Sequence, residues 1–136
     1  MLIADDSDML VERLVAALAR VAGAEVVGRA WTGAGTLECV WRLKPDIVIL
    51  DLCMPGGSGI DVLQDIKKNP LAPLVIVLTN YAQSQYRKKC LQTGASFFFD
   101  KSVEFDKVAE VLRHLVSGAP APVGTLTEGA NGKAGL

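Results

Sequence analysis

This sequence has few cysteines, no excess of either charge and no long hydrophobic run. Cys39, Cys53 and Cys90 are odd in number and widely spaced, which excludes a disulfide framework and a CxxC zinc site, so we expect reduced thiols. Fourteen basic residues oppose fifteen acidic ones, and a net charge of -1 gives no general attraction to nucleic acid or anionic membranes. The apolar runs are far shorter than the roughly 20 residues that span a bilayer. We expect no secretory signal, because the sequence turns acidic at Asp5 with no basic flank or long apolar segment before it. We therefore expect a cytoplasmic protein that binds neither membranes nor nucleic acid directly.

What is present is a regular alternation of two apolar patterns. The 136 residues, half of them apolar, suffice for one domain with one core. Short apolar runs at 2–4, 25–30, 46–51, 74–78 and 96–99 predict five strands. Helical spacing predicts a helix after each strand, with apolar stripes at Leu10, Leu14, Ala17, Leu18 and Val21; at Leu37, Val40 and Trp41; at Ile60, Leu63 and Ile66; within 83–93; and from Phe105 to Val116. The alternation predicts an α/β domain, a doubly wound five-stranded parallel sheet with helices on both faces.

Local signals set the expected ends of the elements. Ser7 or Asp8 is placed to cap the first helix, and Gly23 stands where a C-terminal glycine cap belongs. From Ser117 onward the periodicity disappears, and glycine, proline and alanine dominate. We therefore predict a folded domain over 1–117 and a disordered tail, or a linker to an output domain, over 118–136.

Polar residues stand where several of the predicted strands end. Asp5 and Asp6 follow the first strand, Asp51 closes the third, Thr79 follows the fourth, and Lys101 lies just beyond the fifth. Parallel sheets hold their ligand sites outside the carboxyl ends of the strands, so these residues should meet at one edge. Each has an ordinary explanation when judged alone, such as helix capping or a solvated turn. Together they supply three carboxylates, a hydroxyl and an ammonium, the groups that hold a divalent cation and a phosphoryl group.

The predicted cluster favours phosphoryl transfer to an aspartate. Three carboxylates at one edge repel one another, and a hard cation with oxygen ligands relieves the repulsion, so Mg²⁺ is the expected ion. Beside such a cation Asp51 can attack phosphorus and form an acyl phosphate. Thr79 would donate its hydroxyl to the phosphoryl oxygens, and Lys101 would offset their charge.

These residues carry a resemblance to a known family. The chain resembles the receiver domain of two-component response regulators, of the chemotaxis-regulator type. The resemblance rests on the stretches 2–7, 45–59, 75–79, 94–95 and 100–101, which stand in the family's order and spacing. It covers nearly everything up to Val116 and implies the flavodoxin-like strand order 2-1-3-4-5.

The resemblance also implies roles for named residues. Asp51 would accept a phosphoryl group from a histidine kinase or a phosphotransfer protein, with Thr79 and Lys101 binding the phosphoryl oxygens. Phe98 lies three residues before Lys101, where the family keeps an aromatic switch that turns inward as the threonine moves. Its alternative explanation is a plain core phenylalanine. Enzymatic activity would be limited to Mg²⁺-dependent self-phosphorylation and self-dephosphorylation at Asp51.

The resemblance implies a metal site as well. Asp6 and the carboxylate of Asp51 would bind Mg²⁺ directly, together with the backbone carbonyl of Cys53, and Asp5 would help through water. The Cys53 thiol itself is not an expected ligand, because a soft thiolate suits magnesium poorly.

The sequence departs from the family's pattern in the loops around the site. Ser102 replaces the proline that usually follows the lysine, and we predict a trans Lys101–Ser102 peptide because the other isomer costs about 3 to 4 kcal/mol without proline. Asn80 replaces a smaller residue, which would narrow access to Asp51 or add a hydrogen-bonding group. Tyr81 and Cys53 stand where the family tunes hydrolysis of the acyl phosphate.

One surface is a candidate for partner contact. In receivers the fourth helix, fifth strand and fifth helix form the output or dimer surface, and here Arg87, Lys88 and Lys89 lie on the polar fourth helix. Such a basic run is more often a solvated face, but it could serve as a docking patch.

Two other functions stay open at this point. The first is a receiver-like interaction module that is never phosphorylated. The second is a phosphatase with an aspartate nucleophile, which would need a second aspartate at position 53, where this chain has Cys53. A nucleotide carrier is disfavoured because no glycine-rich turn follows the first strand.

Overall fold

The computed structural model describes residues 1–117, which fold around one five-stranded parallel sheet. Its strands are β1 (Leu2–Ala4), β2 (Gly28–Ala30), β3 (Ile47–Leu50), β6 (Leu74–Thr79) and β7 (Phe97–Asp100). They lie in the order β2-β1-β3-β6-β7, which confirms the predicted order 2-1-3-4-5 of the main strands. The predicted tail, 118–136, lies outside the described residues.

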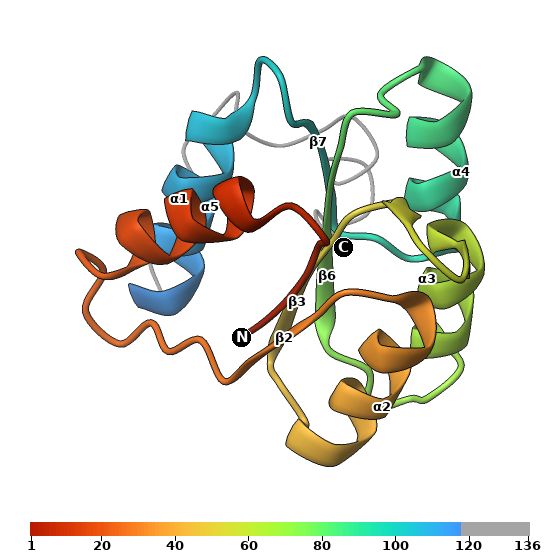
Figure 1. The fold of residues 1–136 in the computed structure, drawn as a ribbon, viewed down its shortest axis with the longest axis horizontal. Helices are drawn as coiled ribbons and strands as arrows, with labels where there is room; N and C mark the ends of the chain where they lie inside the picture. Colours follow the sequence, from red (N-terminus) through yellow and green to blue (C-terminus); the bar gives the residue numbers. More distant parts are fainter. Residues whose placement is uncertain (118–136) are drawn as a thin grey trace.

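Helices cover both faces of this sheet, as predicted. Helices α1 (Asp8–Leu18) and α5 (Phe105–Ser117) lie on one side, and α2 (Gly33–Leu43), α3 (Gly59–Lys67) and α4 (Ser84–Thr93) lie on the other (Figure 1). Each layer encloses its own apolar core against the sheet. Among residues 1–117, no helix combines the length and the apolar character that crossing a membrane requires.

The central strand β3 is buried on both faces, which explains its unbroken apolar sequence. Val48 and Leu50 pack under α2, α3 and α4, while Ile49 packs under α1 and α5. The same alternation divides the phenylalanines of β7, with Phe98 on the first side and Phe97 and Phe99 on the second. A strand with two buried faces carries its polar group only where it ends, and here that group is Asp51.

Side-chain caps fix where three of the helices begin. The hydroxyl of Ser7 accepts the N–H of Leu10 at 3.3 Å, and that of Thr32 accepts the N–H of Gly35 at 3.0 Å. Ser58 caps α3 in the same manner. Helix α4 ends at Gly94, whose φ of 120° favours glycine.

The predicted glycine cap of α1 is wrong. The helix ends at Leu18, and the N–H of the C-cap residue Ala19 donates to the carbonyl of Val15 at 2.9 Å. A further turn follows, in which the N–H of Val21 donates to the carbonyl of Leu18 at 2.9 Å. Gly23 stands beyond this turn with a φ of 88°, against the side chain of Val116.

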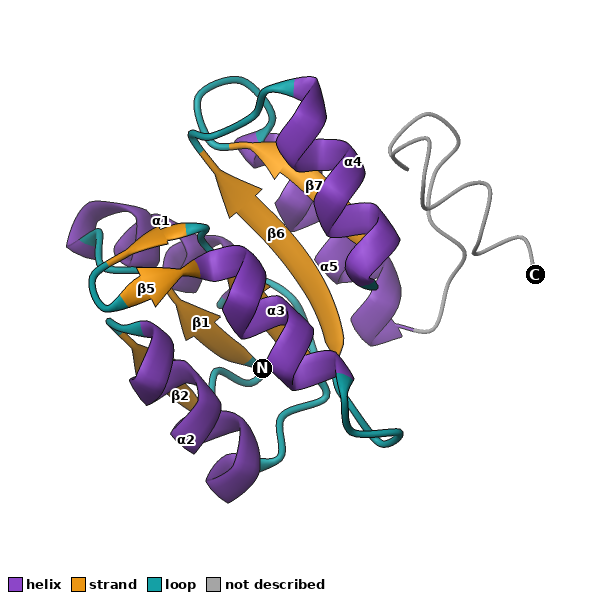
Figure 2. Cartoon of the chain, turned by 90° about the vertical axis from the view of Figure 1, so that its right-hand side faces the viewer, coloured by secondary structure: helices purple, strands orange, loops and turns teal. Residues whose placement is uncertain are grey.

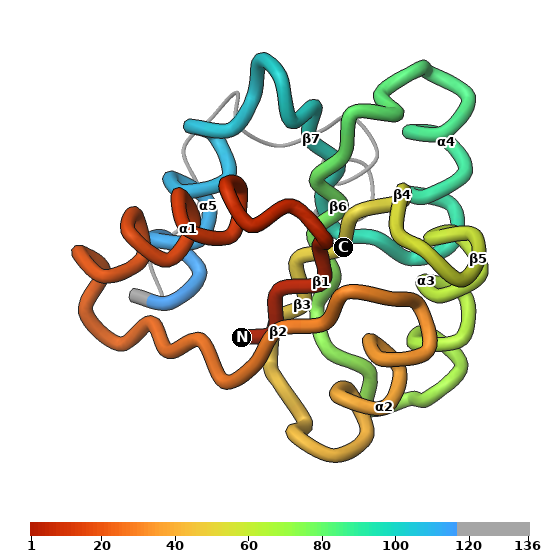
Figure 3. Tube along the Cα trace, viewed as in Figure 1, coloured from red at the N-terminus to blue at the C-terminus, as the bar shows by residue number. Residues whose placement is uncertain are grey.

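Three further details differ from the sequence-based expectations. Strand β2 begins at Gly28 rather than at residue 25, although the N–H of Val27 already bonds the carbonyl of Met1 at 2.8 Å. Trp41 is 45% exposed, because the buried stripe of α2 runs through Thr36, Cys39 and Val40. The expected loop before α3 holds a small antiparallel hairpin, β4 (Cys53–Met54) with β5 (Gly57–Ser58), visible in Figure 3.

At Gly59, helix α3 lies very close to the backbone of the segment that follows β3. A Cβ at this position would meet the Cα of Leu52, and would lie 2.9 Å from the carbonyl oxygen of Leu52 and 3.0 Å from that of Asp51. These are backbone atoms, so no side-chain rotation can relieve the contact.

We predict that Gly59→Ala lowers the free energy of unfolding by about 1 to 3 kcal/mol, the usual cost of overpacking. Urea denaturation measures the loss. Gln64→Ala, on the exposed side of the same helix, is the control and should stay within about 0.5 kcal/mol of the parent. Equal stability of Gly59→Ala and the parent would contradict the close approach.

Candidate functional site

The predicted site residues meet at one edge of the sheet. The arrows of β1 and β6 point the same way in Figure 2, and all neighbouring strands of the main sheet pair in parallel. Ala4 lies opposite Leu50, and Thr79 lies opposite Asp100. The residues that follow these positions, Asp5, Asp51 and Lys101, therefore emerge side by side.

The ammonium of Lys101 lies between two buried carboxylates. Its Nζ is 2.8 Å from Oδ2 of Asp5 and 3.0 Å from Oδ2 of Asp51. Burial alone would lower the pKa of Lys101, but the hydrogen bonds and charges of Asp5 and Asp51 outweigh it and raise that pKa above its usual value. Lys101 is therefore a permanent cation at neutral pH.

The carboxylates of Asp5, Asp6 and Asp51 form a compact acidic cluster. Each offers an oxygen within 4.8 Å of the others; Asp5 and Asp51 are buried, whereas Asp6 is exposed. Burial raises the pKa of Asp5, and the hydrogen bond from Lys101 opposes this rise. One ammonium cannot balance three carboxylates, and oxygen donors at this spacing fit a hard divalent cation.

Backbone N–H groups orient the two buried carboxylates. Oδ1 of Asp5 accepts the N–H of Ser7 at 2.8 Å, and Oδ1 of Asp51 accepts the N–H of Cys53 at 3.1 Å. Ser7 was expected only as a helix cap, and its second contact followed from no sequence pattern. Each buried carboxylate thus has one oxygen on the backbone and the other on Lys101.

A hollow of about 430 Å³ opens over Asp51. The predicted residues Asp6, Asp51, Cys53 and Lys101 line it, together with Ser7, Met9, Leu10, Arg13, Asn80 and Tyr81. Asn80 is exposed and lines this hollow, so its predicted effect on access to Asp51 stays a prediction. The contributions of Met9, Leu10 and Arg13 were not foreseen, because from the sequence they are only residues of an amphipathic helix.

Thr79 lies beside the hollow rather than on its wall. Its side chain is fully buried, and Oγ1 accepts the N–H of Tyr81 at 3.1 Å. This is the backbone contact that would be expected of any strand-end hydroxyl. It leaves the hydroxyl proton available for donation.

The loop after Lys101 closes in a way that proline could not reproduce. The Lys101–Ser102 peptide is trans, as predicted. Oδ1 of Asp100 accepts both the hydroxyl of Ser102 at 2.6 Å and its N–H at 2.9 Å, and these bonds hold the pKa of Asp100 below its usual value. A proline has no N–H to donate here.

The basic run on α4 consists of one partly buried residue and two exposed ones. The guanidinium of Arg87 donates to the carbonyl of Phe98 at 3.1 Å, pairs with Glu104 at 3.3 Å and lies 5.0 Å from the centre of the Phe98 ring. Phe98 itself is fully buried. Lys88 and Lys89 are exposed, whereas the 30% exposed side chain of Arg87 is already engaged, so the predicted docking patch rests mainly on Lys88 and Lys89.

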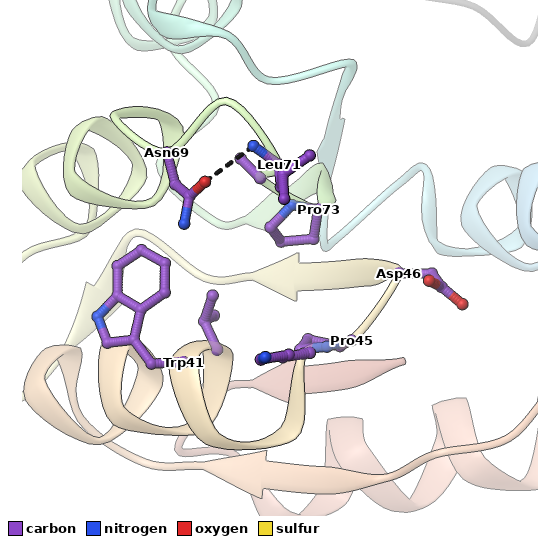
Figure 4. A pocket seen from close by; sticks show the side chains of 9 residues that line it. Trp41, Pro45, Asp46, Asn69, Leu71 and Pro73 are labelled. Carbon is purple, nitrogen blue, oxygen red and sulfur yellow. Dashed lines mark hydrogen bonds between the residues drawn. The ribbon is translucent and has the colours of Figure 1, made fainter.

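A second hollow, of about 490 Å³, lies at the opposite edge of the sheet (Figure 4). Trp41, Pro45, Leu71 and Pro73 supply much of its lining, and Pro45 and Pro73 precede the first residues of β3 and β6. None of the predicted site residues lies in it. The acidic cluster is therefore the candidate site.

The fold and this cluster define a class of α/β proteins with a cation and phosphoryl site at the carboxyl edge of a doubly wound sheet. The chain belongs to the family of response regulator receiver domains, which it matches over residues 1–113. This membership places it in phosphorylation-dependent, two-component signalling and confirms the resemblance read from its motifs.

Several relatives show the same family. The uncharacterized transcriptional regulatory protein YvfU of Bacillus subtilis (strain 168) is 33% identical over 116 residues, which are 85% of this chain and 58% of that protein. Response regulator GacA of Pseudomonas aeruginosa is 27% identical over 86% of this chain and 55% of its own. The chain thus spans little more than half the length of these two relatives.

Solved structures agree with the fold. The response regulator domain of Thermotoga maritima CheB matches with a TM-score of 0.74 at 29% identity, over 87% of this chain and 92% of that chain. The receiver domain of the putative response regulator NarL from Mycobacterium tuberculosis gives 0.76 at 27% identity, over 86% and 94%.

We predict that Lys101→Met lowers the free energy of unfolding by about 3 to 5 kcal/mol at pH 7, because Asp5 and Asp51 stay buried without their cation. Loss of the ammonium removes the hydrogen bond that opposes the effect of burial on Asp5, so the pKa of Asp5 rises further in the folded state. The folded variant then binds more protons than the unfolded chain, so its stability should rise as the pH falls from 8 to 5.

Urea denaturation across this pH range tests the prediction. Lys107→Met is the matched control, because its ammonium pairs with Glu104 on an exposed helix turn and should contribute less than about 1 kcal/mol. A Lys101→Met variant whose stability fell as the pH was lowered from 8 to 5 would contradict the account.

Proposed function

We propose that this chain is a phosphorylation-driven switch that accepts a phosphoryl group on Asp51 from a histidine kinase or a phosphotransfer protein. The observation that supports this most directly is the placement of Asp51 at the base of the hollow, with Lys101 3.0 Å from its carboxylate. The nucleophilic oxygen of Asp51 thus lies next to the ammonium of Lys101, which can bind the phosphoryl oxygens. Family membership supplies the reaction class.

The proposed step is an in-line transfer to a carboxylate oxygen. An oxygen of Asp51 attacks phosphorus, and the O–P bond forms as the N–P bond of a donor phosphohistidine breaks. The ammonium of Lys101 shifts from the carboxylate to the phosphoryl oxygens, whose charge it offsets. Thr79 donates its hydroxyl to one of them, and water later hydrolyses the acyl phosphate.

Mg²⁺ is the proposed cofactor, and it supplies charge neutralisation of the transferred group. Asp6, Asp51 and the backbone carbonyl of Cys53 would hold it, with Asp5 acting through water. The spacing of the three carboxylates supports this assignment. Their repulsion in the free protein gives a binding cation a direct stabilising effect.

The proposed output surface is formed by α4, β7 and α5. Phe98 in β7 is the proposed switch residue, and the contacts of Arg87 join it to α4 and to Glu104. Movement of Thr79 toward a phosphoryl group would therefore reach this surface through β7. The proposal also includes a partner that binds the surface of α4, β7 and α5, and a cytoplasmic location.

We predict that beryllium fluoride with Mg²⁺, which mimics a phosphoryl group, raises the thermal stability of the protein by mass action on the folded state. Asp51→Asn should abolish the rise, because the acceptor oxygen is lost. Asp61→Asn, an exposed aspartate of α3, is the control and should keep the full rise.

Two outcomes separate the alternatives. A rise with Mg²⁺ alone that beryllium fluoride does not increase would favour a metal-binding interaction module that takes no phosphoryl group. An equal rise in Asp51→Asn would place the acceptor elsewhere and contradict the proposal.

A further inference from the structure

Arg29 is a partly buried cation beside the acidic cluster, and the proposed reaction does not use it. It lies in β2, opposite Ile3 of β1, and its side chain is only 20% exposed. Nε and Nη2 both donate to the backbone carbonyl of Asp5, at 3.3 and 3.2 Å. Nη1 lies 2.7 Å from the carboxylate of Asp8, in the first turn of α1. The guanidinium therefore joins three consecutive pieces of structure: β2, the segment after β1, and α1.

The carbonyl that Arg29 holds belongs to the peptide that links Asp5 to Asp6. A peptide unit is planar, so fixing its oxygen also fixes the direction in which the chain enters Asp6. The N–H of Asp5 is held as well, by the carbonyl of Ala30 at 3.0 Å. The backbone of Asp5 is thus bonded to β2 on both sides.

The side chain of Asp6 lacks the supports that its neighbour has. Asp5 is oriented by Lys101 and by the N–H of Ser7, whereas Asp6 is exposed. The position of the Asp6 carboxylate in the cluster therefore depends mainly on its backbone. Arg29 is the side chain that holds this backbone.

We propose that Arg29 is a positioning residue for the metal site, and that it sets cation affinity by holding the Asp5–Asp6 peptide. This inference rests on the proposed Mg²⁺ site. Groups that orient metal ligands typically change metal affinity by about 10- to 100-fold when they are removed. Through space, the positive charge of Arg29 would repel a bound cation and so weaken its binding, although the charge of Asp8 partly neutralises that of Arg29.

The two effects predict opposite results, which makes the inference testable. Arg29→Met removes both the hydrogen bonds and the charge. If positioning dominates, Mg²⁺ binds about 10-fold more weakly. If charge dominates, Mg²⁺ binds more tightly, and the inference is wrong.

The affinity can be read without any phosphorylation assay, from the Mg²⁺ dependence of the melting temperature. Trp31 offers a second signal, since its ring lies 4.6 Å from the Arg29 guanidinium. Trp41 is the chain's other tryptophan, so a Trp41→Phe background isolates the Trp31 fluorescence. Binding of Mg²⁺ to the unsubstituted protein is the first measurement. If the unsubstituted protein does not bind Mg²⁺, the proposed metal site is wrong. If it binds Mg²⁺ and Arg29→Met binds the ion with the same affinity, only the role of Arg29 is wrong.

Three variants complete the design. Arg29→Lys keeps the charge but cannot make both hydrogen bonds to the Asp5 carbonyl, so its Mg²⁺ affinity should lie between those of Arg29→Met and the parent. It also replaces Arg29→Met if that variant fails to fold. Asp8→Asn removes the ion pair but leaves the Asp5 carbonyl held, so its affinity should stay within about 2-fold of the parent. Arg20→Met, an exposed arginine at the end of α1, controls for the loss of one positive charge.

The rate of labelling by acetyl phosphate gives a final discrimination. At saturating Mg²⁺, Arg29→Met should be labelled at the parent rate, because only metal affinity has changed. A rate that stays low at saturating metal would instead indicate a distorted Asp51 site and would contradict a role confined to positioning the cation.

Discussion

The site depends on a single ammonium held between two buried carboxylates. Lys101 lies within 3.0 Å of both Asp5 and Asp51, and these residues come from the ends of three different strands. Without that cation, burial of two carboxylates beside exposed Asp6 would be strongly unfavourable. The same contact keeps Asp51 oriented toward the hollow. The interaction therefore stabilises the fold. In the proposed reaction, Lys101 would move from the carboxylates to the phosphoryl oxygens.

This arrangement also explains how a local event could reach the surface. Lys101 follows Asp100 in the chain, and the N–H of Asp100 donates to Glu104, which pairs with Arg87 on α4. Any shift of Lys101 toward a phosphoryl group therefore acts on a segment already bonded to α4 and α5. Arg29 has the corresponding position on the other side of the cluster, where it holds the Asp5–Asp6 backbone. On our proposals, one side of the site would carry the signal outward, while the other would hold the metal ligands in place.

Much of the fold and of the candidate site could be predicted from the sequence, because a strand buried on both faces leaves few places for a polar residue. That constraint identified Asp51, and the common edge of a parallel sheet then gathered Asp5, Asp6 and Lys101. Other features depend on contacts between distant segments. Apolar periodicity could not show that Trp41 is partly exposed, and no local pattern shows that Arg29 reaches the carbonyl of Asp5. Gly23 has the residue type of a helix cap, but the C-cap of α1 lies four residues earlier, at Ala19.

The central claim is that Asp51 is the acceptor of the phosphoryl group, and intact-mass measurement with peptide mapping tests it most directly. After incubation with acetyl phosphate and Mg²⁺, the account predicts a gain of one phosphoryl group, located in the peptide that contains Asp51 and absent from Asp51→Asn. A phosphoryl group on any other residue, or equal labelling of Asp51→Asn, would contradict it.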